Sequence, residues 1–363
     1  MKRTIIPVKR KTAQSYTIVI GDDCLKKLIV DIKTKKWANR YAIITDSKVK
    51  KLYGEKVQKI LKKAGIETVL ISFIQGEKHK NFKTVQTILD SLFKEEFHRD
   101  DGIIALGGGV VGDIAGFVAS LYMRGIPYIQ IPTTLLAMVD SSVGGKTGVD
   151  TKWGKNLIGS FYNPKAVYIK PSYLQTLPKK QLRNGFSEII KYGIIARPSL
   201  LTFLQKNKES LFAAKTKATS KLIAPCVRIK RTMVQVDERE NGMRKLLNYG
   251  HTIGHAIEKQ SHYTVQHGQA ISIGMSIINT IAVSKKWMSK KNAETIKKLF
   301  KTYGLPTKLP TSFSNVALVN SIKMDKKIKH NKKTFVVATK LGKARLSTSI
   351  TNQDITKACR KHA

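Results

Sequence analysis

The chain has 363 residues, of which 42% are hydrophobic and 25% are charged, and its formal net charge is +42 at pH 7. This composition excludes a disordered chain, and the length is enough for two domains because single hydrophobic cores stop growing near about 250–300 residues. No apolar run reaches the roughly 18 residues of a membrane span, and three scattered cysteines exclude a disulfide framework, so we expect a cytoplasmic protein without a membrane anchor.

The first half of the chain alternates short apolar, β-branched segments with helix-like segments such as residues 49–64. Strands that alternate with helices predict a parallel sheet covered by helices on both faces. The predicted strands are residues 41–45, 68–73, 102–106, 128–131 and 166–169.

The second half has long stretches with helical periodicity, which begin after a loop at residues 170–178. We therefore predict two domains, a Rossmann-like α/β domain over residues 1–172 and a mostly α-helical domain over residues 173–363. The predicted helices are residues 179–196, 200–212, 219–237 and 268–288.

A glycine-rich turn follows the predicted strand at residues 102–106. Gly107, Gly109 and Gly112 have G-x-G-x-x-G spacing between a strand and a helix, which favours a dinucleotide site. A glycine turn that only packs is the alternative. Asp46 ends an earlier strand and is suited to accept from ribose hydroxyls, although a solvated turn aspartate is equally compatible with its position.

A second loop, residues 139–156, is rich in glycine and serine and contains Lys146, Lys152 and Lys155. Backbone N–H groups and ammonium groups in such a loop bind phosphate esters. Asp140 and Asn156 bracket the lysines with further polar groups. A flexible surface loop is the other interpretation.

Histidines concentrate between residues 251 and 267. His251 and His255 are four apart on a predicted helix, as in zinc-binding pairs, and His262 and His267 follow. Two of these histidines together with Glu188 would make a catalytic zinc site. The alternative for Glu188 is an ion pair with Lys191 on the protein surface. Spacing leaves both His251 with His255 and His251 with His267 open.

Further cationic side chains suggest an anionic substrate. Lys230 and Arg244 accompany Glu240 in the second half, and arginine is suited to recognise carboxylates with two hydrogen bonds. The net charge also raises nucleic-acid binding as a rival function. However, residues 101–170 hold six basic and four acidic residues, whereas residues 322–363 hold twelve and two. The excess therefore reads as a lysine-rich surface with only non-specific nucleic-acid contact.

Together these motifs resemble the 3-dehydroquinate synthase family of sugar-phosphate cyclases, and the resemblance runs through nearly the whole chain. The segments that carry it, in order, are QGEKHK, GGGVVGD, YMRGIPYIQIPTTLLAMVDSSVGGKTG, KNLIGSFYNPKAV, FSEIIKYG, LNYGHTIGHAIE and HGQAISIGM. As an ordered set they are highly specific.

The resemblance implies a role for each matching position. The zinc ligands, with Co²⁺ as a substitute, fall on Glu188, His251 and His267, which leaves His255 for proton transfer with Glu240. The catalytic set also includes Lys146. Substrate positions are Arg124, Asp140, Lys146, Asn156, Lys191, Lys230, Arg244, Asn248 and a lysine of the DKKIK segment, Lys327. NAD positions are Asp46, Gln75, Gly76, Glu77, Lys78, His79, Lys80, Gly108, Gly109, Val110, Asp113, Thr133, Thr134, Lys155, Tyr173, Leu174, Gln175 and Thr176.

The implied activity is conversion of 3-deoxy-D-arabino-heptulosonate 7-phosphate (DAHP), a sugar acid phosphate, to 3-dehydroquinate in the shikimate pathway. It proceeds by transient NAD oxidation, phosphate elimination, reduction and intramolecular aldol closure. The resemblance also implies a homodimer, in which Arg124 reaches the partner's substrate. Another sugar-phosphate cyclase of the same fold is the alternative. Met138, Asp150 and Gln269 depart from the residues common in the family, and Gln269, near a predicted ligand, raises the question of metal retention.

Overall fold

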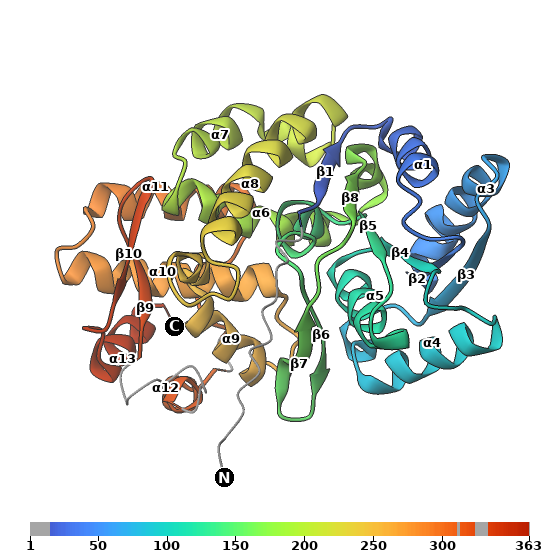
Figure 1. The fold of residues 1–363 in the computed structure, drawn as a ribbon. Helices are drawn as coiled ribbons and strands as arrows, with labels where there is room; N and C mark the ends of the chain where they lie inside the picture. The colour runs from blue at the N-terminus through green and yellow to red at the C-terminus, as the bar shows by residue number, and fades with distance from the viewer. Residues whose placement is uncertain (1–14, 311–312, 324–332, 363) are drawn as a thin grey trace, which may run out of the picture.

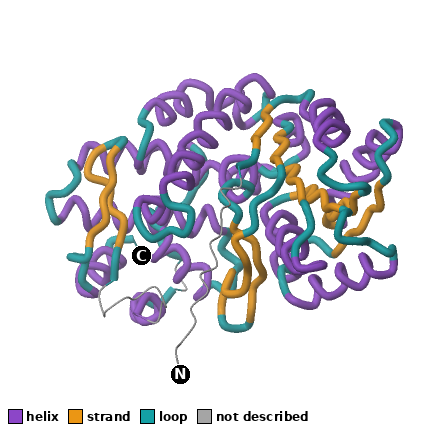
Figure 2. The backbone as a smooth tube through the Cα atoms, in the orientation of Figure 1, coloured by secondary structure: helices purple, strands orange, loops and turns teal. Residues whose placement is uncertain are grey.

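A computed structural model describes residues 15–310, 313–323 and 333–362 of the chain (Figure 1). The half that contains the main sheet lies beside a half built mostly of helices (Figure 2). The predicted fold class, a parallel-sheet domain followed by a mostly helical one, is confirmed. Lys327 lies outside the described residues.

The main sheet has six strands, all parallel, in the order β1-β8-β5-β4-β2-β3. All five predicted strands are present, and the edge strand β1 is one that the sequence patterns missed. The strands are β1 (Thr17–Ile20), β2 (Tyr41–Asp46), β3 (Thr68–Phe73), β4 (Gly102–Gly107), β5 (Tyr128–Pro132) and β8 (Ala166–Ile169).

Apolar side chains of the central strands alternate between the two faces of this sheet. In β2, Tyr41 and Ile43 enter one hydrophobic cluster, whereas Ala42 and Ile44 enter another. Helices α1 and α3 contribute to the first cluster, and α4 and α5 to the second. Both faces of the sheet are thus covered, which is why its strands read as continuous apolar runs. These helices are α1 (Cys24–Lys35), α3 (Glu55–Lys63), α4 (Phe82–Lys94) and α5 (Gly109–Leu121).

Short helical turns connect these elements and carry several predicted site residues. The turns are α2 (Ser47–Val49), η1 (Lys50–Gly54), η2 (Glu77–His79), η3 (Tyr122–Arg124), η4 (Ala137–Ser141), η5 (Pro171–Thr176) and η6 (Met243–Asn248).

Four predicted helices of the second half are confirmed, with ends shifted by up to four residues. The helices are α6 (Lys179–Ile195), α7 (Ser199–Phe212), α8 (Thr216–Val236), α9 (His251–Gln260), α10 (His267–Ser284), α11 (Lys290–Thr302), α12 (Asn315–Lys323) and α13 (Asn352–Arg360). An antiparallel hairpin of β9 (Phe335–Lys340) and β10 (Lys343–Ser347) packs beside them (Figure 1).

Most of the segment that sequence patterns read as a loop, residues 139–156, is regular structure instead. It contains η4 and an antiparallel hairpin of β6 (Lys146–Thr151) and β7 (Gly154–Phe161). The hairpin extends away from the main sheet (Figure 1). The loop prediction was wrong because the glycines and lysines hid two strands that pair only with each other.

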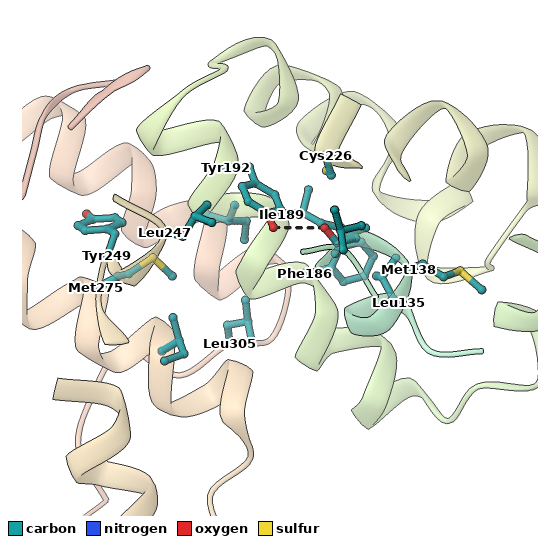
Figure 3. Close-up of a cluster of buried hydrophobic side chains, with 14 of the residues drawn as sticks. Leu135, Met138, Phe186, Ile189, Tyr192, Cys226, Leu247, Tyr249, Met275 and Leu305 are labelled. Atoms are coloured by element: carbon teal, nitrogen blue, oxygen red, sulfur yellow. Dashed lines mark hydrogen bonds between the residues drawn. The ribbon is translucent and has the colours of Figure 1, made fainter. Parts of the chain in front are cut away.

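One hydrophobic cluster runs from the sheet into the helical half. Leu135 and Met138 follow β5, and Figure 3 shows them near Phe186 and Ile189 of α6. Met138, one of the departures from the family pattern, is fully buried and fills this core. The two halves therefore share a core. None of the described helices is long and apolar enough to cross a membrane.

Candidate active site

The predicted cofactor residues gather at one edge of the main sheet, where its parallel strands have their carboxyl ends. Residues from this set follow β2, β3, β4, β5 and β8. The chain leaves β2 toward β3 on one side and β4 toward β5 on the other. Such a switch point between neighbouring strands opens the crevice in which open α/β sheets bind ligands.

The glycine turn lies at this switch point, between β4 and α5. A Cβ atom on Gly108 would lie 2.9 Å from the Thr134 methyl carbon, so only glycine fits there without a shift. The Thr133 amide donates to the Gly107 carbonyl at 2.8 Å, which ties the turn to the end of β5. The first N–H groups of α5 face this edge and suit a pyrophosphate.

Asp46 and the η5 turn flank the glycine turn. Asp46 accepts from the amides of Lys48 and Val49, both at 2.9 Å, and thereby caps α2. The Tyr53 ring packs against the Tyr173 ring in a tilted arrangement, with ring centres 4.1 Å apart, and the Tyr53 hydroxyl donates to the Tyr173 carbonyl at 3.1 Å. Both outer parts of the predicted NAD set are therefore fixed by local contacts.

Lys80 lies at the centre of a polar cluster beneath the β6–β7 hairpin. Its ammonium is 2.5 Å from Asp113 and also donates to the Asn156 amide oxygen. The Asp150 carboxylate accepts a hydrogen bond from the backbone N–H of Asn156 at 2.9 Å. Asn156 has a positive φ of 54°, so this aspartate, a departure from the family pattern, helps to hold a strained residue.

Three predicted ligands meet between α6, α9 and α10. Ligand atoms of Glu188, His251 and His267 lie within 4.8 Å of one another. The Nε2 atoms of both histidines are 3.5 Å from Glu188 Oε1. Glu188 is 0% exposed, and neither of its oxygens has a hydrogen-bond partner among the described residues, although Lys191 forms an ion pair with Oε2.

Burial and neighbouring charges shift the pKa of each member of this triad in a different way. Burial raises the pKa of Glu188, but Lys191 and His267 lower it below its usual value. Burial lowers the pKa of His251 well below its usual value, and Lys191 lowers it further. Burial lowers the pKa of His267, whereas the carboxylates of Glu188 and Glu258 raise it to about 10. A metal ion at the triad would thus displace a proton from His267.

His255 faces a second group of potential ligands. It is exposed, and together with Glu258 and His267 it forms another set whose ligand atoms lie within 4.8 Å. His267 is therefore common to both sets, whereas the helical pair of His251 and His255 does not share one set. The ring centres of that pair are 5.4 Å apart.

Glu258 is a site residue to which the sequence motifs assign no role. It is 2% exposed, and its carboxylate lies 3.1 Å from Lys155 and 3.4 Å from His267 Nδ1. Lys155 also pairs with Glu77 at 3.0 Å. Glu258 follows His255 by three residues and His251 by seven, which places all three on one helix face. That spacing was the available signal.

Asp140 and Lys230 form the centre of the predicted substrate group. Lys230 is 2.7 Å from the Asp140 carboxylate, and Tyr192 donates to that carboxylate at 2.6 Å. Burial raises the pKa of Asp140, but Lys230 and Lys191 lower it below the usual range. Lys191 lies beside Glu188 on α6, so this group adjoins the metal triad.

Glu240 lies in a loop that Asp237 organises. The Asp237 carboxylate accepts from three backbone amides, including that of Arg244 at 3.0 Å. Glu240 has a positive φ of 61° and contacts Lys146 and Asn248. Lys146, at the start of the β6–β7 hairpin, and Asn248, in η6, are thereby brought together although 102 residues apart.

Arg244 is 2% exposed, and its guanidinium contacts backbone carbonyls rather than a carboxylate. It donates to the Gly144 carbonyl at 3.2 Å and to the Glu238 carbonyl. Arg124 is separate from these groups. It is exposed at the carboxyl end of η3, and it has no hydrogen bond or ion pair within the part of the chain that the structure describes.

Gln269, which raised the question of metal retention, has its side chain in the N-terminal cap of α10. Its side-chain oxygen accepts from the Gln266 amide at 3.1 Å, and together they form a capping box at the start of α10. This departure from the family pattern therefore lies in the helix cap, and the carboxylate that supports His267 is that of Glu258.

Comparisons with known proteins agree with the motifs. Family models described as "3-dehydroquinate synthase N-terminal" and "3-dehydroquinate synthase C-terminal" match residues 70–184 and 185–328. A 3-dehydroquinate synthase of Desulforamulus reducens is 41% identical over 94% of this chain and 96% of its own. That of Thermodesulfovibrio yellowstonii is 41% identical over 95% and 96%.

Solved structures are similar over almost the full length. The 2-epi-5-epi-valiolone synthase of Streptomyces hygroscopicus, with NAD⁺ and Zn²⁺ bound, has a TM-score of 0.90 at 26% identity and covers 98% of this chain and 99% of its own. A 2-deoxy-scyllo-inosose synthase with carbaglucose-6-phosphate, NAD⁺ and Co²⁺ has a TM-score of 0.87 at 24% identity, over 97% and 98%. An iron-containing alcohol dehydrogenase of Thermotoga maritima shares the fold, with a TM-score of 0.67 at 17% identity over 96% and 97%.

Proposed function

The chain belongs to the 3-dehydroquinate synthase family, and from that premise we propose that it converts DAHP to 3-dehydroquinate and phosphate with NAD and zinc. The observation that carries the proposal is the meeting of the Glu188, His251 and His267 side chains beside the Asp140 and Lys230 group. A metal site next to fixed cations suits a phosphorylated, carboxylated substrate.

A zinc ion, or cobalt in its place, fits the triad because its donors are one carboxylate and two imidazoles, a ligand set that leaves an open position for substrate. The buried Glu188 carboxylate supports this assignment, because its Oε1 has no hydrogen-bond partner among the described residues and lies 3.5 Å from the Nε2 atoms of both histidines. NAD fits the edge of the sheet where Gly108 permits close approach and α5 begins. When bound, zinc supplies a Lewis acid for a substrate hydroxyl and NAD a reversible hydride acceptor.

The protein's own side chains bind and orient the substrate. We assign the substrate carboxylate to Lys230, Arg244 and Asn248, which converge from α8 and η6. This requires Arg244 to exchange a backbone carbonyl for the carboxylate, a stronger acceptor. Lys146 and Asn156, on the β6–β7 hairpin, are assigned to the substrate's remaining polar groups.

Proton transfer is assigned to Glu240 and His255. The Glu240 carboxylate is held from both sides by Lys146 and Asn248, so its oxygens have a fixed position. His255 is exposed beside the triad, where its ring exchanges protons with solvent. Positioned acids and bases of this kind contribute about 10²–10⁴-fold to a rate.

The test is to incubate the purified chain with DAHP, NAD and zinc and to measure phosphate and 3-dehydroquinate together. Equal amounts of both products and no net NADH are expected. The Glu188→Gln variant is the matched control, since it removes one ligand charge at constant size. Phosphate release without dehydroquinate, or neither product, would refute the proposed activity.

A second candidate is another sugar-phosphate cyclase, which the similarity to the valiolone synthase favours. Such an enzyme would accept a heptulose phosphate without a carboxylate. We therefore expect the Arg244→Ala variant to lose activity on DAHP much more than on a heptulose phosphate that lacks the carboxylate. Better wild-type turnover of the sugar phosphate without a carboxylate would favour the second candidate.

We also propose a homodimer, because Arg124 is exposed next to Leu121, which is 44% exposed. The β6–β7 hairpin adds Trp153 and Phe161, at 74% and 50% exposure. Sedimentation of the wild type and of the Leu121→Asp variant tests this, and a monomeric wild type would refute it.

Nucleic-acid contact is proposed to be non-specific only. A cytoplasmic location is proposed because all three cysteines are free and buried, as in reducing compartments, and fractionation of the host cell tests it.

A further inference from the structure

Glu258 lies between two sites that the proposed function treats separately. It belongs to α9, and its two oxygens point to different partners, Oε1 to Lys155 at 3.1 Å and Oε2 to His267 Nδ1 at 3.4 Å. Lys155 comes from the β6–β7 hairpin, and His267 is the first residue of α10. One buried carboxylate thus connects three elements.

Toward the metal, Glu258 determines which nitrogen of His267 is available. A neutral imidazole carries its proton on one nitrogen and offers a lone pair on the other. Donation of Nδ1–H to Glu258 leaves the lone pair on Nε2, the atom that lies 3.5 Å from Glu188. His251 has the same arrangement, since its Nδ1 is 3.1 Å from the Tyr249 carbonyl and its Nε2 faces Glu188.

Toward the cofactor, Glu258 fixes a lysine that is itself only 23% exposed. Lys155 is held between Glu258 and Glu77, at 3.1 and 3.0 Å, and its ammonium lies 4.7 Å from the Tyr263 ring centre. Glu77 belongs to η2, in the segment that follows β3 at the cofactor edge. Lys155 therefore connects Glu258, beside the metal ligand His267, with Glu77, at the cofactor edge of the sheet.

We propose that Glu258 is a positioning residue that orients His267 toward the metal and Lys155 toward the cofactor, and thereby couples the binding of zinc to the binding of NAD. The inference rests on the proposed function for the identity of the two ligands. Zinc bound to His267 would strengthen the Nδ1–H donor, which would draw Glu258 toward His267 and fix one of the two carboxylates that hold Lys155. By linkage, NAD must then raise the affinity for zinc by the same factor as zinc raises the affinity for NAD.

The experiment measures both affinities on the full-length chain. Zinc affinity is measured by competition with a chelator, with and without saturating NAD, and NAD affinity by quenching of protein fluorescence, with and without zinc. In the wild type we expect each ligand to strengthen the other by about 5-fold or more, the usual lower range of such coupling. In Glu258→Gln we expect zinc affinity to fall about 10–100-fold and the coupling factor to fall to near one.

Glu77→Gln is the matched control, because Glu77 pairs with Lys155 but not with His267. It is expected to weaken NAD binding and to leave zinc affinity measured without NAD unchanged. Visible spectra of the Co²⁺-loaded proteins add a readout of ligand geometry: the bands are expected to shift in Glu258→Gln and not in Glu77→Gln. Thermal unfolding identifies a variant that fails to fold, in which case Glu258→Asp, which retains the charge, replaces it with the same expected loss of coupling.

Wild-type zinc affinity in Glu258→Gln, an unchanged coupling factor, or a wild type without coupling would each overturn the inference. A wild type that binds zinc and NAD with coupling but forms no dehydroquinate from DAHP would instead refute the proposed function and leave the role of Glu258 intact.

Discussion

Replacing Gly268 with alanine is expected to disrupt metal binding, although Gly268 offers no ligand atom. A Cβ atom at this position would lie 2.2 Å from the backbone carbonyl oxygen of Asn184 and 2.6 Å from the Ser187 hydroxyl. Gly268 follows His267 on α10, and Ser187 precedes Glu188 on α6. Because a backbone carbonyl cannot rotate away, the two helices that carry these ligands must separate.

The required movement is large for a metal site. Real Cβ atoms essentially never show contacts under 3.0 Å, so the gap must widen from 2.2 to at least 3.0 Å, a difference of 0.8 Å. Metal–ligand distances are held within about 0.2 Å. We therefore expect Gly268→Ala to lose zinc affinity by at least about 10–100-fold, the loss seen when a ligand's support is disturbed, and to lose about 1–3 kcal/mol of unfolding free energy from overpacking.

The assay is chelator competition for zinc, with urea unfolding of the zinc-free protein beside it. Gly193→Ala is the control, because its Cβ would crowd α6 against the Leu201 side chain of α7, at 2.3 Å, and away from the triad. It should lose stability and keep its zinc affinity. If Gly268→Ala binds zinc as tightly as the wild type, the packing of α6 on α10 does not set the ligand geometry.

Three further predictions concern the triad, acid stability and charge. His267→Ala is expected to lose zinc by more than about 100-fold, whereas His255→Ala keeps zinc and slows turnover by about 10²–10⁴-fold; equal zinc loss in both would make the helical pair the ligands. Burial raises the pKa of Asp31, but hydrogen bonds from Tyr168 and Lys27 lower it below its usual value. A carboxyl group whose pKa is lowered by folding stabilises the folded state fully above its unfolded pKa of about 4. This stabilisation is lost as the pH falls through the folded pKa. Asp31→Asn should therefore lose about 1.5 kcal/mol near neutral pH and less under acid in urea unfolding, and a pH-independent difference would contradict this. Binding to duplex DNA should collapse as salt rises from about 0.05 to 0.2 M, and sequence preference that survives this rise would show a specific nucleic-acid function.

Much of the fold was predictable because its strands have local signatures. Residues 68–73 and 166–169 were assigned with the observed bounds, since each is a short apolar run between polar segments. β1 was missed because it is a short edge strand whose pairing with β8 joins residues about 150 positions apart. The β6–β7 hairpin was missed because its glycines and lysines lack the alternation that identifies strands.

The metal ligands of the site were predictable from the sequence, whereas the roles of Glu258 and Gln269 were not. The motif resemblance named Glu188, His251 and His267, which the structure brings together. Glu258 was missed, although its spacing from His251 and His255 places it on their helix face, because its contact with Lys155 joins residues 103 positions apart and that contact has no signal in the sequence of α9. The effect of Gln269 was also not predictable, since only the capping geometry of α10 reveals where its side chain points.

The β6–β7 hairpin has an evolutionary consequence. Lys155 and Asn156 are consecutive residues, yet one reaches Glu258 and the other Lys80. The register of β7 on β6 places both side chains, so deleting or inserting one residue in the turn at residues 152–153 would move both of them away from these partners. Drift in the length of this surface turn should therefore be selected against, and relatives should vary in its residue types before they vary in its length.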